Sequence, residues 1–221
     1  MAILEVIACS VADAIEAERG GASRLEIVRA LDGGGLTPPV SLVRGIVAAV
    51  SIPVRVMLRE NPGFEAGSEA EVKKLCHAAR EFAALGVNGL VLGFVRGRQL
   101  DLAPAPSILS SAPGVKATFH RAFEELDDAA AGIAALKAMP QFDRILLSPT
   151  RVRGLQVLVD IAAPELTIVA GGGMDADAIR VLLKATDIRE FHVGRAARHH
   201  ADIRQPVDAA RVRELAALVA R

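Results

Sequence analysis

The sequence contains neither tryptophan nor tyrosine, and its seven phenylalanines are scattered along 221 residues. Few aromatic rings are therefore present on which unstacked bases could stack. The 26 basic residues are matched by 26 acidic ones, so no net charge draws the chain toward a polyanion. We therefore expect no nucleic-acid partner.

Cysteine is also scarce, since Cys9 and Cys76 are the two thiols of the chain. Two cysteines do not make a disulfide framework, and a reducing compartment is typical of such a chain. The first residues include the acidic Glu5 and no basic stretch, which argues against a signal peptide. Apolar runs such as residues 46–50 are far shorter than a bilayer requires. Together these absences predict a cytoplasmic protein without a membrane partner.

Lysine is rare among the basic residues, with five lysines against 21 arginines. Four lysines fall in predicted helices and the fifth begins a predicted strand, so none is placed at a strand end for Schiff-base chemistry. The chain also has no Walker loop and no Gly-x-Ser-x-Gly elbow. An aldolase-type, nucleotide-hydrolysing or serine-hydrolase site is therefore disfavoured.

What is present is a regular alternation of strand-like apolar segments with amphipathic helical segments. The predicted strands are residues 2–8, 24–28, 54–59, 89–93, 116–121, 144–148, 167–170 and 190–193. Strict alternation favours parallel strands joined by crossover helices. Eight such units in this length predict an α/β fold, a single (β/α)8 TIM barrel that spans residues 1–221. An open doubly wound sheet is the alternative, although such sheets usually have fewer strands.

Polar side chains lie at or near the carboxyl ends of several predicted strands, where a barrel carries its functional site. The candidate catalytic residues are Glu5, Glu26, Arg59, His120, Arg121 and His192. Carboxylates, arginines and histidines in one site suit general acid–base chemistry or an oxygen-rich or metal ligand. The alternative is a structural layer of buried ion pairs, in which Arg55 and Arg59 neutralise Glu5 and Glu26.

A second set of residues follows the last two predicted strands, where barrels commonly bind phosphate. The set comprises Gly171, Gly172, Gly173, Gly194 and Arg195. Glycines let backbone N–H groups approach an anion, and an arginine can pair with it through two parallel hydrogen bonds. We interpret the set as a candidate anion-binding site; tight turns without a ligand are the alternative.

Several motifs together resemble one known family. The most specific is Thr-Phe-His-Arg-Ala-Phe at residues 118–123; the others lie within residues 4–5, 16–22, 24–26, 34–38, 52–54, 144–146, 171–173 and 190–192. With these motifs the chain resembles, nearly from end to end, the CutC family of so-called copper homeostasis proteins. The resemblance implies a cytoplasmic (β/α)8 barrel with a role in copper homeostasis and copper as the cofactor to consider.

The chain departs from the resemblance at the thiols. Cysteines that family members often carry near the end of the first strand and after the second-strand glutamate are replaced by Ile7 and Val28, and Cys9 is displaced by two residues. Cu(I) prefers thiolate and thioether ligands. We therefore expect weak direct Cu(I) binding, for which Cys9, His120 and His192 are the candidate ligands.

Two functions remain open on the sequence. The first is a copper-homeostasis protein of the CutC type. The second is a barrel enzyme that uses lyase-, isomerase- or hydrolase-like acid–base chemistry on a small phosphorylated or carboxylated metabolite. The sequence does not decide whether the protein is an enzyme. In either case we expect a small-molecule anion or a metal ion as the partner, and a homo-oligomer is compatible with the sequence.

Overall fold

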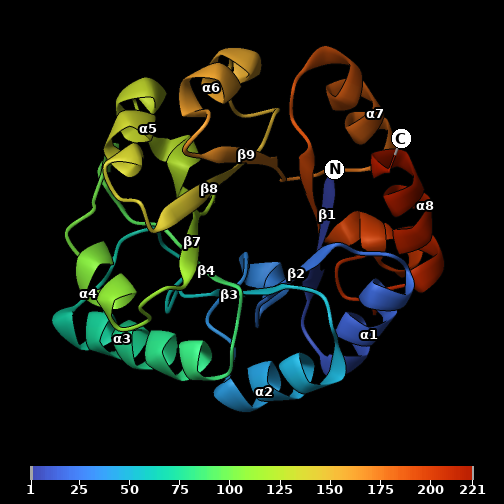
Figure 1. The fold of residues 1–221 in the computed structure, drawn as a ribbon, viewed down its shortest axis with the longest axis horizontal. Helices are drawn as coiled ribbons and strands as arrows, with labels where there is room; N and C mark the ends of the chain where they lie inside the picture. Colours follow the sequence, from blue (N-terminus) through green and yellow to red (C-terminus); the bar gives the residue numbers. More distant parts are fainter. Residues whose placement is uncertain (1, 221) are drawn as a thin grey trace.

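A computed structural model describes residues 2–220 of the chain. Within these residues, eight parallel strands close into a barrel in the order β1-β10-β9-β8-β7-β4-β3-β2. The helices form an outer ring around the strands (Figure 1). The predicted TIM barrel is confirmed.

The barrel strands follow the predicted apolar segments closely. They are β1 (Ile3–Ala8), β2 (Arg24–Ile27), β3 (Val54–Met57), β4 (Gly89–Leu92), β7 (Lys116–Phe119), β8 (Phe142–Leu147), β9 (Thr167–Ala170) and β10 (Glu190–Val193). Outside the barrel, β5 (Val95–Arg96) and β6 (Gln99–Leu100) pair antiparallel. Gly97 makes the turn between them, and its φ of +61° suits a residue without a side chain.

The first seven helices connect successive barrel strands, as parallel pairing requires, and the eighth follows β10. The helices are α1 (Val11–Arg19), α2 (Val40–Ala49), α3 (Glu69–Ala84), α4 (Ala105–Ser110), α5 (Ala129–Lys137), α6 (Leu155–Ala162), α7 (Ala176–Ala185) and α8 (Ala209–Val219). Short 3-10 turns are η1 (Leu31–Gly33), η2 (Arg121–Glu125), η3 (Arg195–Ala197) and η4 (His199–Ala201). The start of α3 is a capping box between Ser68 and Glu71, as its sequence predicts. None of the helices within residues 2–220 is long and apolar enough to cross a bilayer.

The predicted strand at residues 116–121 was two residues too long. β7 ends at Phe119, because His120 leaves the sheet and caps η2. The Nδ1 atom of His120 accepts a hydrogen bond of 3.2 Å from the N–H of Ala122. The most specific motif of the sequence therefore lies where a strand turns into the loop at the barrel mouth.

Two apolar clusters hold the barrel. The larger one packs the outward faces of the strands against the helices, with Val6, Ile27 and Phe82 among its fully buried members. The smaller one, Ile7, Val28, Met57 and Val91, belongs to four adjacent strands. Ile7 lies two residues after Glu5 and Val28 two residues after Glu26, so each points to the same side of the sheet as that glutamate. The smaller cluster therefore lines the interior of the barrel.

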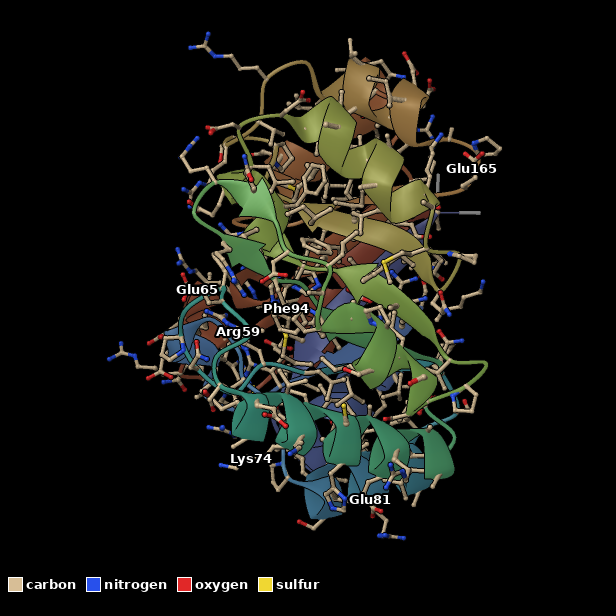
Figure 2. All side chains as sticks on the ribbon, turned by 90° about the vertical axis from the view of Figure 1, so that its left-hand side faces the viewer. Arg59, Glu65, Lys74, Glu81, Phe94 and Glu165 are labelled. Carbon is tan, nitrogen blue, oxygen red and sulfur yellow. The ribbon has the colours of Figure 1, made fainter. Side chains whose placement is uncertain are left out.

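Charged side chains are divided between the periphery and the barrel mouth. Figure 2 shows Lys74 and Glu165 at the outside of the molecule, whereas Arg59 lies among the elements. Arg59 is 9% exposed. A nearly buried guanidinium requires hydrogen-bond partners inside the protein, and these define part of the site described below.

The first and last helices meet at Gly20, where a side chain would not fit. A Cβ atom at Gly20 would come within 2.4 Å of the Cβ of Val212 on α8. We expect Gly20→Ala to lower the free energy of unfolding by about 1–3 kcal/mol through overpacking, measured by urea denaturation. Gly33→Ala is the control, since a Cβ there would meet no described atom within 4 Å, and it should change stability by less than about 0.5 kcal/mol. Equal losses in both variants would contradict the steric explanation.

Candidate functional site

A cavity of about 430 Å³ opens at the carboxyl ends of the barrel strands. Its walls include Ile7, Glu26, Met57, His120, Gly172 and Arg195. Apolar side chains from the inner cluster thus share the cavity with carboxylate, imidazole and guanidinium groups. The volume suits a small metabolite, and the position is where TIM barrels carry their sites.

A network of buried ion pairs crosses the barrel on the inner side of this cavity. Arg24 on β2 donates to a carboxylate oxygen of Glu5 on β1 and, over 2.6 Å, to Glu190 on β10. Arg144 on β8 donates to both oxygens of Glu190, at 2.8 and 2.9 Å. These charge-assisted contacts tie together strands from both ends of the sequence.

Arg55 on β3 extends the network to the other side of the barrel. Its guanidinium donates to both oxygens of Asp143, at 2.8 and 2.6 Å, and to the hydroxyl of Thr118 at 2.7 Å. Asp143 also accepts from Arg144. Gly89 on β4 leaves room for this crossing, because a Cβ there would lie 2.9 Å from Cζ of Arg55.

The structural alternative drawn from the sequence was wrong in its pairings. Glu5 is paired with Arg24 rather than with Arg55 or Arg59. Arg55 is paired with Asp143, and neither arginine makes an ion pair with Glu26 among the described residues. A buried ion-pair layer does exist, but it leaves Glu26 out.

Glu5, Glu26 and His192 lie together at the boundary between this layer and the cavity. The Nδ1 atom of His192 is 2.8 Å from a carboxylate oxygen of Glu5 and 3.6 Å from Oε2 of Glu26. Within residues 2–220, Oε2 of Glu26 is buried and has no hydrogen-bond partner. The structure therefore brings together three residues that the sequence placed in one site, and one of them carries an unsatisfied acceptor.

The ionisation of these three groups follows from their surroundings. Burial raises the pKa of Glu26 to about 7, an effect that the nearby His192 reduces and the carboxylate of Glu5 increases. Burial also opposes ionisation of Glu5, but Arg24 and His192 hold the pKa of Glu5 well below its ordinary value. For His192, burial is outweighed by Glu26 and Glu5, which raise its pKa.

Arg59 lies in the cavity wall. Its guanidinium donates to the carbonyl oxygens of Gly63 at 3.1 Å, of Gly34 at 3.2 Å, and of Pro62. It also lies over the ring of Phe64, at 4.8 Å from the centroid. Arg59 thus fastens the loop after β3 to the glycine-rich loop after β2.

His120 forms the next part of the same wall. Its ring centroid is 5.4 Å from that of Phe64. Burial, together with the positive charge of Arg59, lowers the pKa of His120 to about 3. The imidazole is therefore neutral at physiological pH, with Nδ1 used as an acceptor by the backbone of η2.

Arg121 also lines the cavity and is half-buried. Its guanidinium makes two parallel hydrogen bonds with the carboxylate of Glu124, at 2.8 and 3.0 Å. Glu124 is itself almost fully buried, and it also accepts from the N–H of Ser148 at 2.7 Å. Glu124 thereby holds Arg121 in place against Gly172.

The predicted anion-binding set is divided by the structure. Gly172, Gly173, Gly194 and Arg195 line the cavity. Gly171 instead extends the sheet, where its N–H donates to the carbonyl of Leu147 at 2.8 Å. Asp175 also lines the cavity, and its side chain caps the N-terminus of α7. An anion would therefore meet Arg195 and the glycine loops, because a carboxylate already occupies that helix terminus.

The two cysteines lie apart from the three-residue group. The sulfur of Cys9 is 3.7 Å from a guanidinium nitrogen of Arg198, and burial raises the pKa of this thiol to about 11. Cys76 is on α3 and packs against the outer core. Within residues 2–220, one group of at least three histidine, cysteine or acidic residues brings a donor atom of each member within 4.8 Å of the others. This group consists of Glu5, Glu26 and His192.

The sequence reasoning missed some of the residues that build the site. Arg24 and Glu190 share strand faces with Glu26 and His192, and that two-residue spacing was the available signal. Phe64 and Asp143 carried no such signal. Phe64 belongs to an irregular loop, and Asp143 becomes a partner of Arg55 only through the closure of the barrel.

Comparisons with known sequences all match this chain to one family. The sequence profile of the CutC family matches residues 2–197. A family protein CutC of Xanthomonas axonopodis pv. citri is 35% identical over 196 residues, which cover 86% of this chain and 81% of the relative. The human copper homeostasis protein cutC homolog is 30% identical, with 86% of this chain and 72% of the relative covered.

Solved structures show the same fold. The CutC structure from Streptococcus agalactiae superposes with a TM-score of 0.79 at 24% identity, covering 87% of this chain and 98% of that one. Phosphoribosylanthranilate isomerase from Thermotoga maritima reaches 0.64 at 11% identity, covering 100% and 99%. At these identities the likeness concerns the fold alone.

The neutral state of His120 leads to a pH-dependent stability. An unfolded histidine takes up a proton near pH 6.5, whereas folded His120 stays neutral down to about pH 3. The stability is therefore complete above pH 6.5 and is lost progressively as the pH falls toward 3. In His120→Asn, which keeps a capping acceptor, the free energy of unfolding should fall less steeply between about pH 6.5 and 4 than in the wild type.

Urea unfolding at successive pH values measures both slopes. His77→Asn is the control, because His77 is exposed on α3, and this variant should keep the slope of the wild type. If His120→Asn and the wild type lose stability equally steeply, His120 is not the buried neutral base described above.

Proposed function

The chain belongs to the CutC family, and from this membership we propose that it acts in copper homeostasis in the cytoplasm. The names of the mouse and human relatives, copper homeostasis protein cutC homologs, support this assignment. The partner that we propose for the cavity is a small-molecule anion or a metal ion. A balanced net charge supports the exclusion of nucleic acid and membrane surfaces as partners.

One observation bears on whether the protein binds Cu(I) directly, namely the protonation of its cysteine thiols. Cys9 is the cysteine nearer the barrel interior, and its pKa of about 11 keeps it protonated at physiological pH. To bind Cu(I), which takes thiolates, Cys9 would have to release this proton. Its neighbours in the inner cluster are apolar side chains and the single thioether of Met57. We infer that the protein serves copper homeostasis without storing Cu(I) in a thiolate site.

Competition for Cu(I) tests this form of the proposal. The reduced protein, titrated with Cu(I) in the presence of a chromogenic Cu(I) chelator, should leave the metal with the chelator. Cys9→Ser should give the same curve as the wild type, because the thiol contributes no thiolate. Stoichiometric withdrawal of Cu(I) by the wild type that is abolished in Cys9→Ser would overturn the proposal.

A second function is favoured by a separate observation, the arginine-rich rim of the cavity. Arg121 and Arg195 face a space of about 430 Å³ together with the backbone of Gly172 and Gly173. Arg195 is exposed and has no ion-pair partner among the described residues, so its charge remains available to a ligand. This arrangement supports an enzyme that acts on a small phosphorylated or carboxylated metabolite through acid–base chemistry.

Inorganic phosphate serves as the probe for this rim. At a phosphate concentration about ten times the Kd, the Tm should rise by roughly 3–6 °C relative to chloride at equal ionic strength. Arg195→Gln should remove most of the rise, whereas Arg180→Gln should retain it. Arg180 is an exposed arginine on α7, paired with Asp177. A rise of equal size in both variants would show general ion effects rather than a site.

A further inference from the structure

The side chains of Glu5, Glu26 and His192 come from three strands that lie next to one another. β1 pairs with β10 on one side and with β2 on the other. Glu5 and His192 stand at the same level of the sheet, and Glu26 is level with Ile7, two residues nearer the mouth. One donor atom from each of the three lies within 4.8 Å of the other two. Two carboxylate oxygens and one imidazole nitrogen thus converge on one point.

The second observation concerns one oxygen of Glu26, which is buried without a hydrogen-bond partner in the described part of the chain. The residue is 3% exposed and borders the cavity, and its Oε2 atom has no hydrogen-bond partner within residues 2–220. A buried carboxylate oxygen without a partner costs free energy that folded proteins normally avoid. An oxygen so placed, aimed at a neighbouring carboxylate and an imidazole, indicates a ligand that the protein itself does not supply.

The arginines of the ion-pair layer are already matched by carboxylates other than Glu26. Arg24, Arg55 and Arg144 are matched by three carboxylates, those of Glu5, Asp143 and Glu190. Three positive charges against three negative charges leave the layer neutral, so none of its arginines is left to pair with Glu26. The charged group nearest to Glu26 Oε2 is then the imidazole of His192, at 3.6 Å, beyond hydrogen-bond distance.

We propose that Glu5, Glu26 and His192 bind a divalent cation at the inner end of the cavity. Carboxylate oxygen with imidazole nitrogen is the donor set of Zn²⁺, Mn²⁺, Fe²⁺ or Cu²⁺ rather than of Cu(I). Three protein ligands leave coordination positions open toward the cavity, where water or an anionic metabolite would bind. The site is separate from the Cu(I) question, since it contains no sulfur.

The layer beneath would serve as support for such a site. Arg24 holds the second oxygen of Glu5 and so fixes the direction of the first. Outer partners of this kind orient metal ligands, and their loss commonly weakens metal binding by about 10–100-fold. The rival occupant is a water molecule, since Nε of Arg55 is a second buried polar atom without a hydrogen-bond partner within residues 2–220.

Calorimetric titration decides between the two occupants. The untagged full chain is stripped with a chelator, dialysed, and titrated separately with Mn²⁺, Zn²⁺ and Cu²⁺. We expect saturable binding of at least one cation with one site per chain. Glu26→Gln keeps the shape of the side chain and removes the charge, and it should weaken that binding by at least about 100-fold, more than the loss of an outer partner.

Two controls keep the outcome interpretable. His199 and Asp208 form an exposed histidine–carboxylate pair, at 3.1 Å, on the surface. His199→Asn should leave the affinity unchanged, which separates the interior site from adventitious surface binding. Thermal unfolding of the metal-free variants checks folding, and Glu26→Gln should unfold at or above the wild-type Tm because it removes an unpaired buried carboxyl.

Three results would overturn the proposal. The first is no saturable binding of any of the three cations to the wild type. The second is equal affinity in the wild type and Glu26→Gln. The third is a loss of binding in His199→Asn. Retention or release of Cu(I) in the chelator competition bears on the copper proposal alone, so the two proposals can fail separately.

Discussion

The structure depends on keeping several charged side chains buried inside a closed barrel. Arg24, Arg55 and Arg144 are largely removed from water, and removing the partner of any of them would leave an uncompensated charge. Each planar guanidinium must therefore lie where two carboxylate oxygens can accept from it. This requirement fixes the relative positions of strands from both ends of the chain, and it explains why Gly89 faces the side chain of Arg55.

The same layer positions the residues of the candidate site. Arg24 engages Glu5, and Glu5 in turn holds the imidazole of His192, so a chain of contacts sets the position of the histidine. Glu26 stands two residues beyond Arg24 on the same strand, above the reach of the arginine hydrogen bonds. Its carboxylate is consequently turned toward the cavity with an unsatisfied oxygen. The ion pairs of the layer are satisfied within the protein, whereas Glu26 at its edge borders the cavity with an unsatisfied oxygen.

Much of the fold and part of the site could be predicted from the sequence. Eight alternating units predicted the barrel, and two-residue spacing placed Glu5, Glu26 and His192 on inward faces. The same spacing placed Arg59 with them, and Arg59 lines the cavity. The sequence could not predict how Arg59 is held, because the carbonyl groups that accept its hydrogen bonds belong to loops without periodicity. The same reason hid Phe64, which stacks against Arg59 and lies beside His120.

Periodicity, strand-end polarity and the motif at residues 118–123 are local properties. The barrel, the family and the mouth as the place of the candidate site could therefore be predicted from the sequence. The scarcity of cysteine is also evident from the sequence. Only the tertiary structure decided which charges pair. Arg55 meets Asp143 across 88 residues and Arg24 meets Glu190 across 166. Such pairings follow from the closure of the sheet, which brings the first strand beside the last, and no local pattern encodes that distance.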